Sequence, residues 1–93
     1  MVVGILRFSL AIHDARSLKD KRRVVLSIKE KVKNRFNVSI AEVDDHDFHK
    51  SASLGVCVVA SEQSHADSQL QKTLNFISSQ APVIDVAMEF ISL

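Results

Sequence analysis

The densest group of side chains that could do chemistry lies at residues 42–49, which contain four carboxylates and two imidazoles. His46 and His49, with Asp45 beside them, have a spacing that suits ligands of a divalent ion. Successive residues of a strand point to opposite faces, however, and aspartates also favour turns at a sheet edge. We therefore interpret the segment as a polar turn and keep a metal site as the alternative.

Two other positions carry groups of catalytic type. His13 precedes Asp14 and Ser17, but this run does not contain a recognisable set of nucleophile, base and orienting group. Cys57, the only cysteine, lies in an apolar run, which predicts a buried or interface thiol with little reactivity. Phosphate-binding glycine loops and dinucleotide fingerprints are absent from the sequence. We expect a protein that is not an enzyme and that uses no cofactor.

Positive charge is concentrated in residues 18–36. This segment carries eight Lys and Arg residues against two acids, a net charge of +6, whereas the whole chain has a net charge of +1. A polyanion such as RNA would be attracted to it, because each phosphate contact releases condensed counterions. The alternative is a solvated helix face balanced by the acids of the same chain. The candidate anion contacts are Ser17, Lys19, Lys21, Arg22, Arg23, Lys29, Lys31 and Lys33.

Two of these cations lie near the apolar side of the expected helix. Lys21 and Lys29 would have to reach outward along their stems to contact a phosphate. A sheet that stacks RNA bases is not expected, because Phe8 falls on the predicted core side of its strand and the chain has no Trp or Tyr. Any RNA contact should therefore be made to the phosphate backbone of the RNA, and its affinity should depend strongly on salt concentration.

Hydrophobic periodicity predicts the elements that position these residues. Alternation predicts strands at residues 2–12, 38–43, 52–60 and 83–91, and a period of 3.6 predicts helices at 18–36 and from Ser61 or Ser64 to before Pro82. The order β-α-β-β-α-β favours an α+β, ferredoxin-like split sandwich, with a four-stranded antiparallel sheet and two helices on one face. We expect residues 1–93 to form a single domain of this type.

The second strand has an imperfect alternation. Val38 and Ile40 share one face, while Ala41 and Val43 share the other. Either this strand is buried on both faces, or a bulge shifts its register.

The predicted architecture leaves one face of the sheet without helices. The residues expected there include Val3, Ile5, Cys57 and Val59, together with Val43, Val83, Ala87 and Ile91. At about 25 cal/mol per Å², burial of several hundred Å² would favour association by several kcal/mol before ordering costs. We hypothesise a homo-oligomer with Val3, Ile5, Cys57 and Val59 in its interface, and an ordinary mixed surface is the alternative.

The sequence predicts a cytoplasmic location and no membrane partner. No apolar run reaches the roughly 18 residues that a membrane span requires. Arg7 interrupts the apolar N-terminal stretch, and no targeting signal is recognisable. A single thiol fits a reducing compartment.

Two blocks of the chain, SLKDKRRVV at residues 17–25 and RFNVSIAEVDD at 35–45, resemble the YlxP-like family of small bacterial proteins, a domain of unknown function. The resemblance extends through residues 54–56, 75–77 and 83–86 and covers nearly the whole chain. It implies a ferredoxin-like domain, a bacterial cytoplasmic protein and, from the usual gene neighbours, a role related to RNA or the ribosome. No catalytic residue is implied. Where the family commonly has Asp-Leu-Trp, this chain has Asp47, Phe48 and His49.

These observations favour a small non-enzymatic protein that contacts RNA or a ribosome-associated factor through its basic helix. The alternative is a self-associating scaffold or protein-interaction module that uses the uncovered sheet face and binds no nucleic acid.

Overall fold

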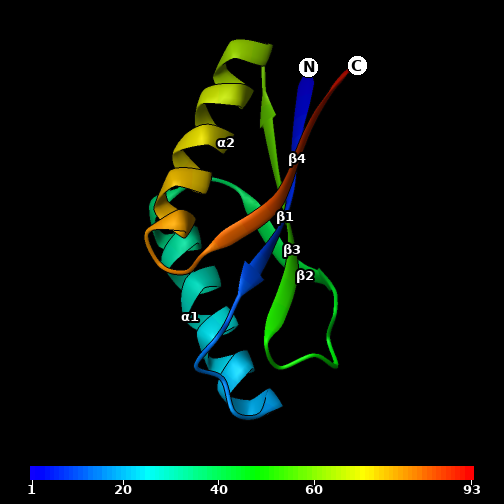
Figure 1. The fold of residues 1–93 in the computed structure, drawn as a ribbon. Coiled ribbons are helices and arrows are strands. Elements are labelled where there is room, and N and C mark those ends of the chain that lie inside the picture. The colour runs from blue at the N-terminus through cyan, green and yellow to red at the C-terminus, as the bar shows by residue number, and fades with distance from the viewer.

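The computed structural model describes residues 1–93 and has six regular elements. They are β1 (Val2–Ala11), α1 (Leu18–Arg35), β2 (Ser39–Asp44), β3 (Ser51–Ala60), α2 (Gln63–Ser78) and β4 (Val83–Ser92). The strands form one antiparallel sheet in the order β2-β3-β1-β4, and both helices cover the same side of it (Figure 1). The predicted ferredoxin-like β-α-β-β-α-β architecture is therefore confirmed.

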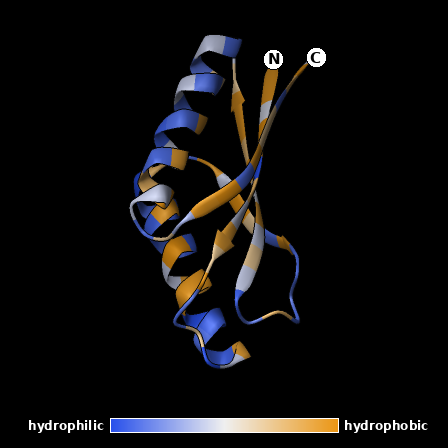
Figure 2. Cartoon of the chain, viewed as in Figure 1, coloured by the Kyte–Doolittle hydropathy of each residue, from blue (hydrophilic) through white to orange (hydrophobic).

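The core lies between the sheet and the two helices. Even-numbered residues of β1 face the helices, and Leu6, Phe8 and Leu10 are fully buried. The helices contribute Val25, Ile28, Val32, Ala66, Leu70 and Ile77. The strands are hydrophobic along much of their length, whereas both helices alternate between hydrophobic and hydrophilic residues, as amphipathic helices on a sheet should (Figure 2).

Helix α2 passes very close to β1 at Gly4. A Cβ atom at this position would lie 2.9 Å from Leu70 Cδ1 and 3.1 Å from Val58 Cγ1. The missing side chain therefore allows the helix to approach the strand. Neither Ser61 nor Ser64, the two residues expected at the start of this helix, caps it, since the N-cap is Glu62 and makes no side-chain hydrogen bond.

A bulge in β2 resolves the ambiguity of the second strand. The pairing with β3 is regular up to Glu42 and shifts between Glu42 and Asp44. Ile40 is buried against the helices, while Val43 is half exposed on the other side. The bulge interpretation is confirmed, and burial of this strand on both faces is wrong.

A second irregularity changes the alternation of β4. The pairing of β1 with β4 shifts between Arg7 and Ser9, and Asp85 in the opposite segment has a positive φ of 55°. As a result Val83 pairs with Leu10 and packs against the core, whereas Ile84 is exposed. The expectation that Val83 lies on the uncovered face is therefore wrong, because one extra residue moves every side chain beyond it to the opposite face.

The two ends of the chain lie side by side (Figure 1). The Met1 amino group donates to the Leu93 carbonyl at 3.0 Å, and the Leu93 amide donates to the Met1 carbonyl at 2.8 Å. Neither helix combines the length and the apolar character that crossing a bilayer would require.

Candidate functional site

The basic helix α1 begins in a well-formed cap. The Ser17 hydroxyl oxygen accepts a hydrogen bond from the Asp20 amide at 3.1 Å, and the Asp20 carboxylate accepts one from the Arg16 amide at 3.0 Å. The first of these bonds satisfies a backbone donor that the first turn would otherwise leave free, and the second fixes the residue that precedes the cap. Ser17 therefore acts as the helix cap, and Asp20 places a negative charge beside the N-terminus that would have attracted an anion.

Lys21 points into the protein rather than toward solvent. Its side chain is only 1% exposed, and its Nζ lies 2.7 Å from Glu42 Oε2 in β2. The same Nζ donates a hydrogen bond to the Asp45 carbonyl oxygen at 2.6 Å. The prediction that Lys21 contacts a phosphate is therefore wrong, because a carboxylate and a carbonyl on the neighbouring strand hold its ammonium inside.

The two sequence blocks that carry the family resemblance meet at this ion pair. Lys21 lies in block 17–25, and Glu42 and Asp45 lie in block 35–45. Asp45 adopts a positive φ of 62°, a conformation that aspartate tolerates better than most residues. The contacts tie the start of the β2–β3 loop to the first turn of α1, and this gives the two blocks a structural role.

Five other cations of α1 form its outward-facing side, which we call the outer arc. With roughly 100° between successive helical residues, they span about 120° of the helix circumference. They are Lys19, Arg22, Arg23, Lys29 and Lys33, of which only Lys29 is half-buried. Glu30 and the half-exposed Leu26 share this arc.

The cations of the outer arc make no ion pair with the acids of the chain. Three contacts join a basic side chain to a carboxylate, and α1 takes part in only one of them, through Lys21. On the flank facing α2, Lys31 donates to Gln80 Oε1 at 3.1 Å, and the Arg35 guanidinium lies 4.4 Å from the centre of the Phe76 ring. The outer arc therefore carries five cations against one acid, Glu30, and none of these cations is in an ion pair.

The uncovered sheet face brings together the predicted interface residues. Val3 lies between Val59 and Ile91, and in the next row Ile5 lies beside Cys57. Val59 is 66% exposed and Cys57 is exposed as well, so the thiol is not buried within the monomer. A shallow cavity of about 320 Å³ opens on this face, lined mainly by apolar residues of β1, β2 and β3.

The β2–β3 loop does not assemble a metal site. No three His, Cys, Asp or Glu residues come together in a way that could hold a metal ion. Asp45 uses its carbonyl to hold Lys21, His46 is exposed and His49 is half-buried. The alternative interpretation of these three residues as ligands therefore has no structural basis. Phe48, at 60% exposure, is the large apolar side chain of this loop.

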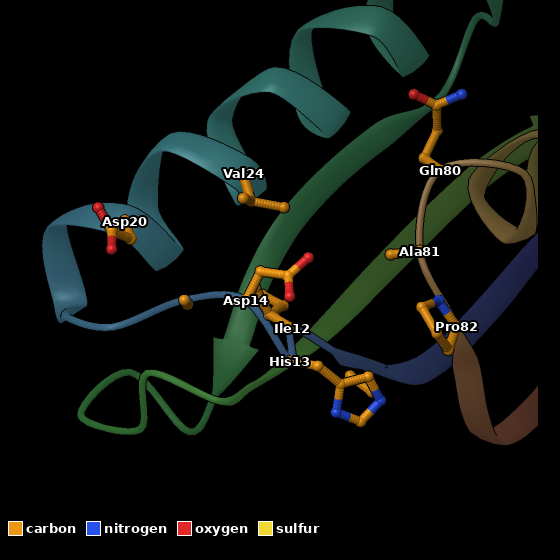
Figure 3. Close-up of a pocket in the computed structure, with 10 residues that line it drawn as sticks. Ile12, His13, Asp14, Asp20, Val24, Gln80, Ala81 and Pro82 are labelled. Atoms are coloured by element: carbon orange, nitrogen blue, oxygen red, sulfur yellow. The ribbon is translucent and has the colours of Figure 1, made fainter.

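The residues around His13 line a cavity of about 290 Å³ between the β1–α1 loop, the start of α1 and the α2–β4 loop. Figure 3 shows the Asp14 carboxylate pointing toward the space between Val24 and Ala81, whereas the His13 ring points away from α1. Because the two side chains diverge, they do not form an acid–base pair.

Glu42 is the functional partner that the sequence interpretation missed. The signal for it was present, because Lys21 lies four residues before Val25 and in phase with the buried stripe that continues through Ile28 and Val32. A lysine at such a position needs a carboxylate or carbonyls from a neighbouring element.

Comparison with known proteins places this architecture in a family. Residues 3–89 match the family described as "Protein of unknown function (DUF503)". The chain belongs to this family. The uncharacterized protein YlxP of Bacillus subtilis (strain 168) is 38% identical over 78 residues, which covers 84% of this chain and 85% of YlxP. The resemblance inferred from the sequence blocks is therefore confirmed, and the DUF503 family itself is of unknown function.

Solved structures support the fold. The de novo designed protein Foldit4 superposes with a TM-score of 0.55 at 15% identity, covering 99% of this chain and 97% of the design. LarC2, the C-terminal domain of a cyclometallase in its apo form, superposes with a TM-score of 0.55 at 13% identity, covering 98% of this chain and 55% of the LarC2 chain. The designed ferredoxin-fold protein LFR1 1 superposes with a TM-score of 0.51 at 13% identity, covering 100% of this chain and 87% of the design. At these identities the similarity concerns the fold alone.

Proposed function

We propose that this DUF503 protein is a small non-enzymatic binding protein of the cytoplasm that holds RNA, including RNA in ribosome-associated particles, through the outer arc of α1. The contacts are made to phosphates by Lys19, Arg22, Arg23, Lys29 and Lys33. Lys31, on the α2 flank, can join them if it gives up its bond to Gln80.

The observation that carries this proposal is the lack of internal partners for these cations. A solvated helix face balanced by the chain's own acids would show ion pairs to neighbouring elements, and only the buried Lys21 makes one. Five cations on one side of an 18-residue helix fit the spacing of a phosphate backbone better than that of a single small anion.

In the proposed complex the protein contacts the phosphate backbone of the RNA and has little preference for its base sequence. Phe8 is fully buried, and Phe36, Phe76 and Phe90 are partly buried against the core, so the sheet does not present a platform for base stacking. For single-stranded RNA the logarithm of the binding constant should fall with the logarithm of salt concentration, with a slope of about −0.7 for each phosphate contact.

The proposal is tested by fluorescence anisotropy with a labelled single-stranded RNA that carries a 5′-hydroxyl. The double variant Arg22→Glu and Arg23→Glu should abolish binding and leave the thermal unfolding curve unchanged, because both side chains are exposed. Lys72→Glu, a charge reversal on the exposed side of α2, is the control and should bind like the parent protein. If the double variant keeps its affinity, the outer arc is not the RNA site.

A second candidate function, self-association through the uncovered sheet face, is favoured by the exposure of Val59 at 66% and of Ile91 at 40%. Sedimentation should then show a dimer at micromolar concentration that does not depend on salt and that Ile5→Asp converts to a monomer. Cys57 lies beside Ile5 and offers a direct check, since two such faces in contact should allow an oxidative cross-link between the two thiols. A monomer that forms no cross-link would exclude this function.

A further inference from the structure

A groove of about 620 Å³ lies between the end of α1, the end of β3 and one side of α2. Its volume is within the range of small-molecule sites, roughly 300–1,000 Å³. It lies on the α2 flank of α1, away from the outer arc, and none of the outer-arc cations lines it.

The charged residues of this groove are all of one sign. They are Arg35, from the last turn of α1, and Lys72, from α2, and the imidazole of His65 lies about two helical turns before Lys72. No carboxylate is among the eleven residues that line it. The Glu62 carboxylate lies 4.0 Å from the His65 imidazole, where both side chains are exposed at the rim. Neither Arg35 nor Lys72 makes an ion pair, so both charges are available to a ligand.

One of these cations is already held in place. The Arg35 guanidinium lies 4.4 Å from the centre of the Phe76 ring, and Phe76 in turn packs against Phe36 with ring centres 6.0 Å apart. Stacking on an aromatic face restricts the guanidinium plane and leaves its N–H groups free at the edge. A phosphate would therefore meet a donor that loses little conformational freedom on binding.

Neutral polar side chains complete the lining. They are Asn37, Ser61, Ser68 and Gln69. None of these four side chains takes part in a hydrogen bond within the protein, and Gln69 contributes only its backbone carbonyl, which accepts from the Thr73 hydroxyl. Amides and hydroxyls of this kind suit a ribose or the edge of a base.

We propose that this groove binds a nucleotide through its terminal phosphate, with Arg35 and Lys72 as the charged contacts and His65 as a further donor. A terminal phosphate carries a charge of about −1.5 to −2 near neutral pH, which two permanent cations balance, whereas a phosphate inside an RNA strand carries only one negative charge. The site is independent of the proposed RNA function of the outer arc. A free nucleotide and the phosphorylated 5′ end of a strand share the required chemistry.

The test is an NMR titration of the whole protein with adenosine monophosphate. Amide shifts should cluster at Asn37, Ser61 and Gln69, and Lys72→Glu should weaken binding about tenfold, as expected for loss of a hydrogen bond to a charged group. Arg22→Glu, the matched charge reversal on the outer arc, should leave the nucleotide affinity unchanged. Lys72 is exposed and makes no ion pair, so its replacement should not disturb the fold.

Further titrations distinguish a strand end from a free nucleotide as the ligand, and both from simple binding of phosphate. Groove shifts with an RNA oligomer that has a 5′-phosphate, and none with the 5′-hydroxyl oligomer, would support the proposal with a strand end as the ligand. Shifts with adenosine monophosphate alone would support it with a free nucleotide. The proposal is overturned if Lys72→Glu binds the nucleotide like the parent protein, or if inorganic phosphate binds as tightly as adenosine monophosphate. Because 5′-hydroxyl RNA reports only on the outer arc, failure here leaves that proposal unaffected.

Discussion

Lys21 and Arg22 are adjacent and carry the same charge, yet they belong to different regions of the molecule. Successive helical residues are rotated by roughly 100°, so Lys21 lies on the side of α1 that faces the sheet, where Glu42 and Asp45 hold its ammonium. Arg22 lies on the outer arc and has no acidic partner. The first is a structural tether and the second a free charge. The net charge of a helix therefore overstates the number of charged side chains that are free to contact a ligand.

The largest expected effect comes from breaking the tether. Lys21→Met should lower the free energy of unfolding by about 3 kcal/mol, because the Glu42 carboxylate would then lie largely buried without its cation. Urea denaturation followed by circular dichroism measures this loss.

The matched control removes both charges. Lys21→Met combined with Glu42→Leu should recover most of the lost stability, since a buried ion pair can often be replaced by apolar side chains at little cost. A Lys21→Met protein as stable as the parent would show that the 2.7 Å contact contributes no stability.

An intermediate effect is expected on the outer arc, in binding rather than in folding. Replacing Lys29 and Lys33 by Ala should flatten the salt dependence of RNA binding by about 0.7 for each phosphate contact removed. The free energy of unfolding should change by less than about 0.5 kcal/mol for exposed Lys33. Equal slopes for the variant and the parent protein would place the phosphate contacts elsewhere.

The smallest effect is expected at the exposed counterpart of the tether. Arg7 and Asp44 also join a cation to the β2 segment, but at 3.5 Å and with side chains 59% and 65% exposed. Arg7→Ala should change the free energy of unfolding by no more than about 0.5 kcal/mol, because water and salt screen such a pair. A loss comparable to that of Lys21→Met would mean that burial does not separate the two contacts.

Much of the fold was predictable because local patterns and tertiary packing agree. The alternation of Leu6, Phe8 and Leu10 predicts a strand with one buried face, and the structure buries all three fully. The helical stripe through Val25 and Val32 is likewise buried. Apolar side chains are stabilised by burial and need no specific partner, so their spacing indicates which face of a strand or helix packs against the core.

The errors occur where one residue shifts the register or where a partner comes from far along the chain. The bulge opposite Arg7 and Ser9 exchanges the faces of Val83 and Ile84, and period-two counting cannot detect it. The groove between α1 and α2 joins Arg35 to Lys72, which are far apart in the sequence. A polar stripe at His65, Gln69 and Lys72 was visible on α2, but nothing in the sequence placed it beside the end of α1.

The amino-acid sequence by itself determined the order of the strands and helices and the excess of positive charge on the first helix, because hydrophobic period and composition are local properties. Only the tertiary structure decided which of those charges remain free. That choice depends on whether a carboxylate from a distant strand lies within a few ångströms of each ammonium, and strand pairing sets those distances.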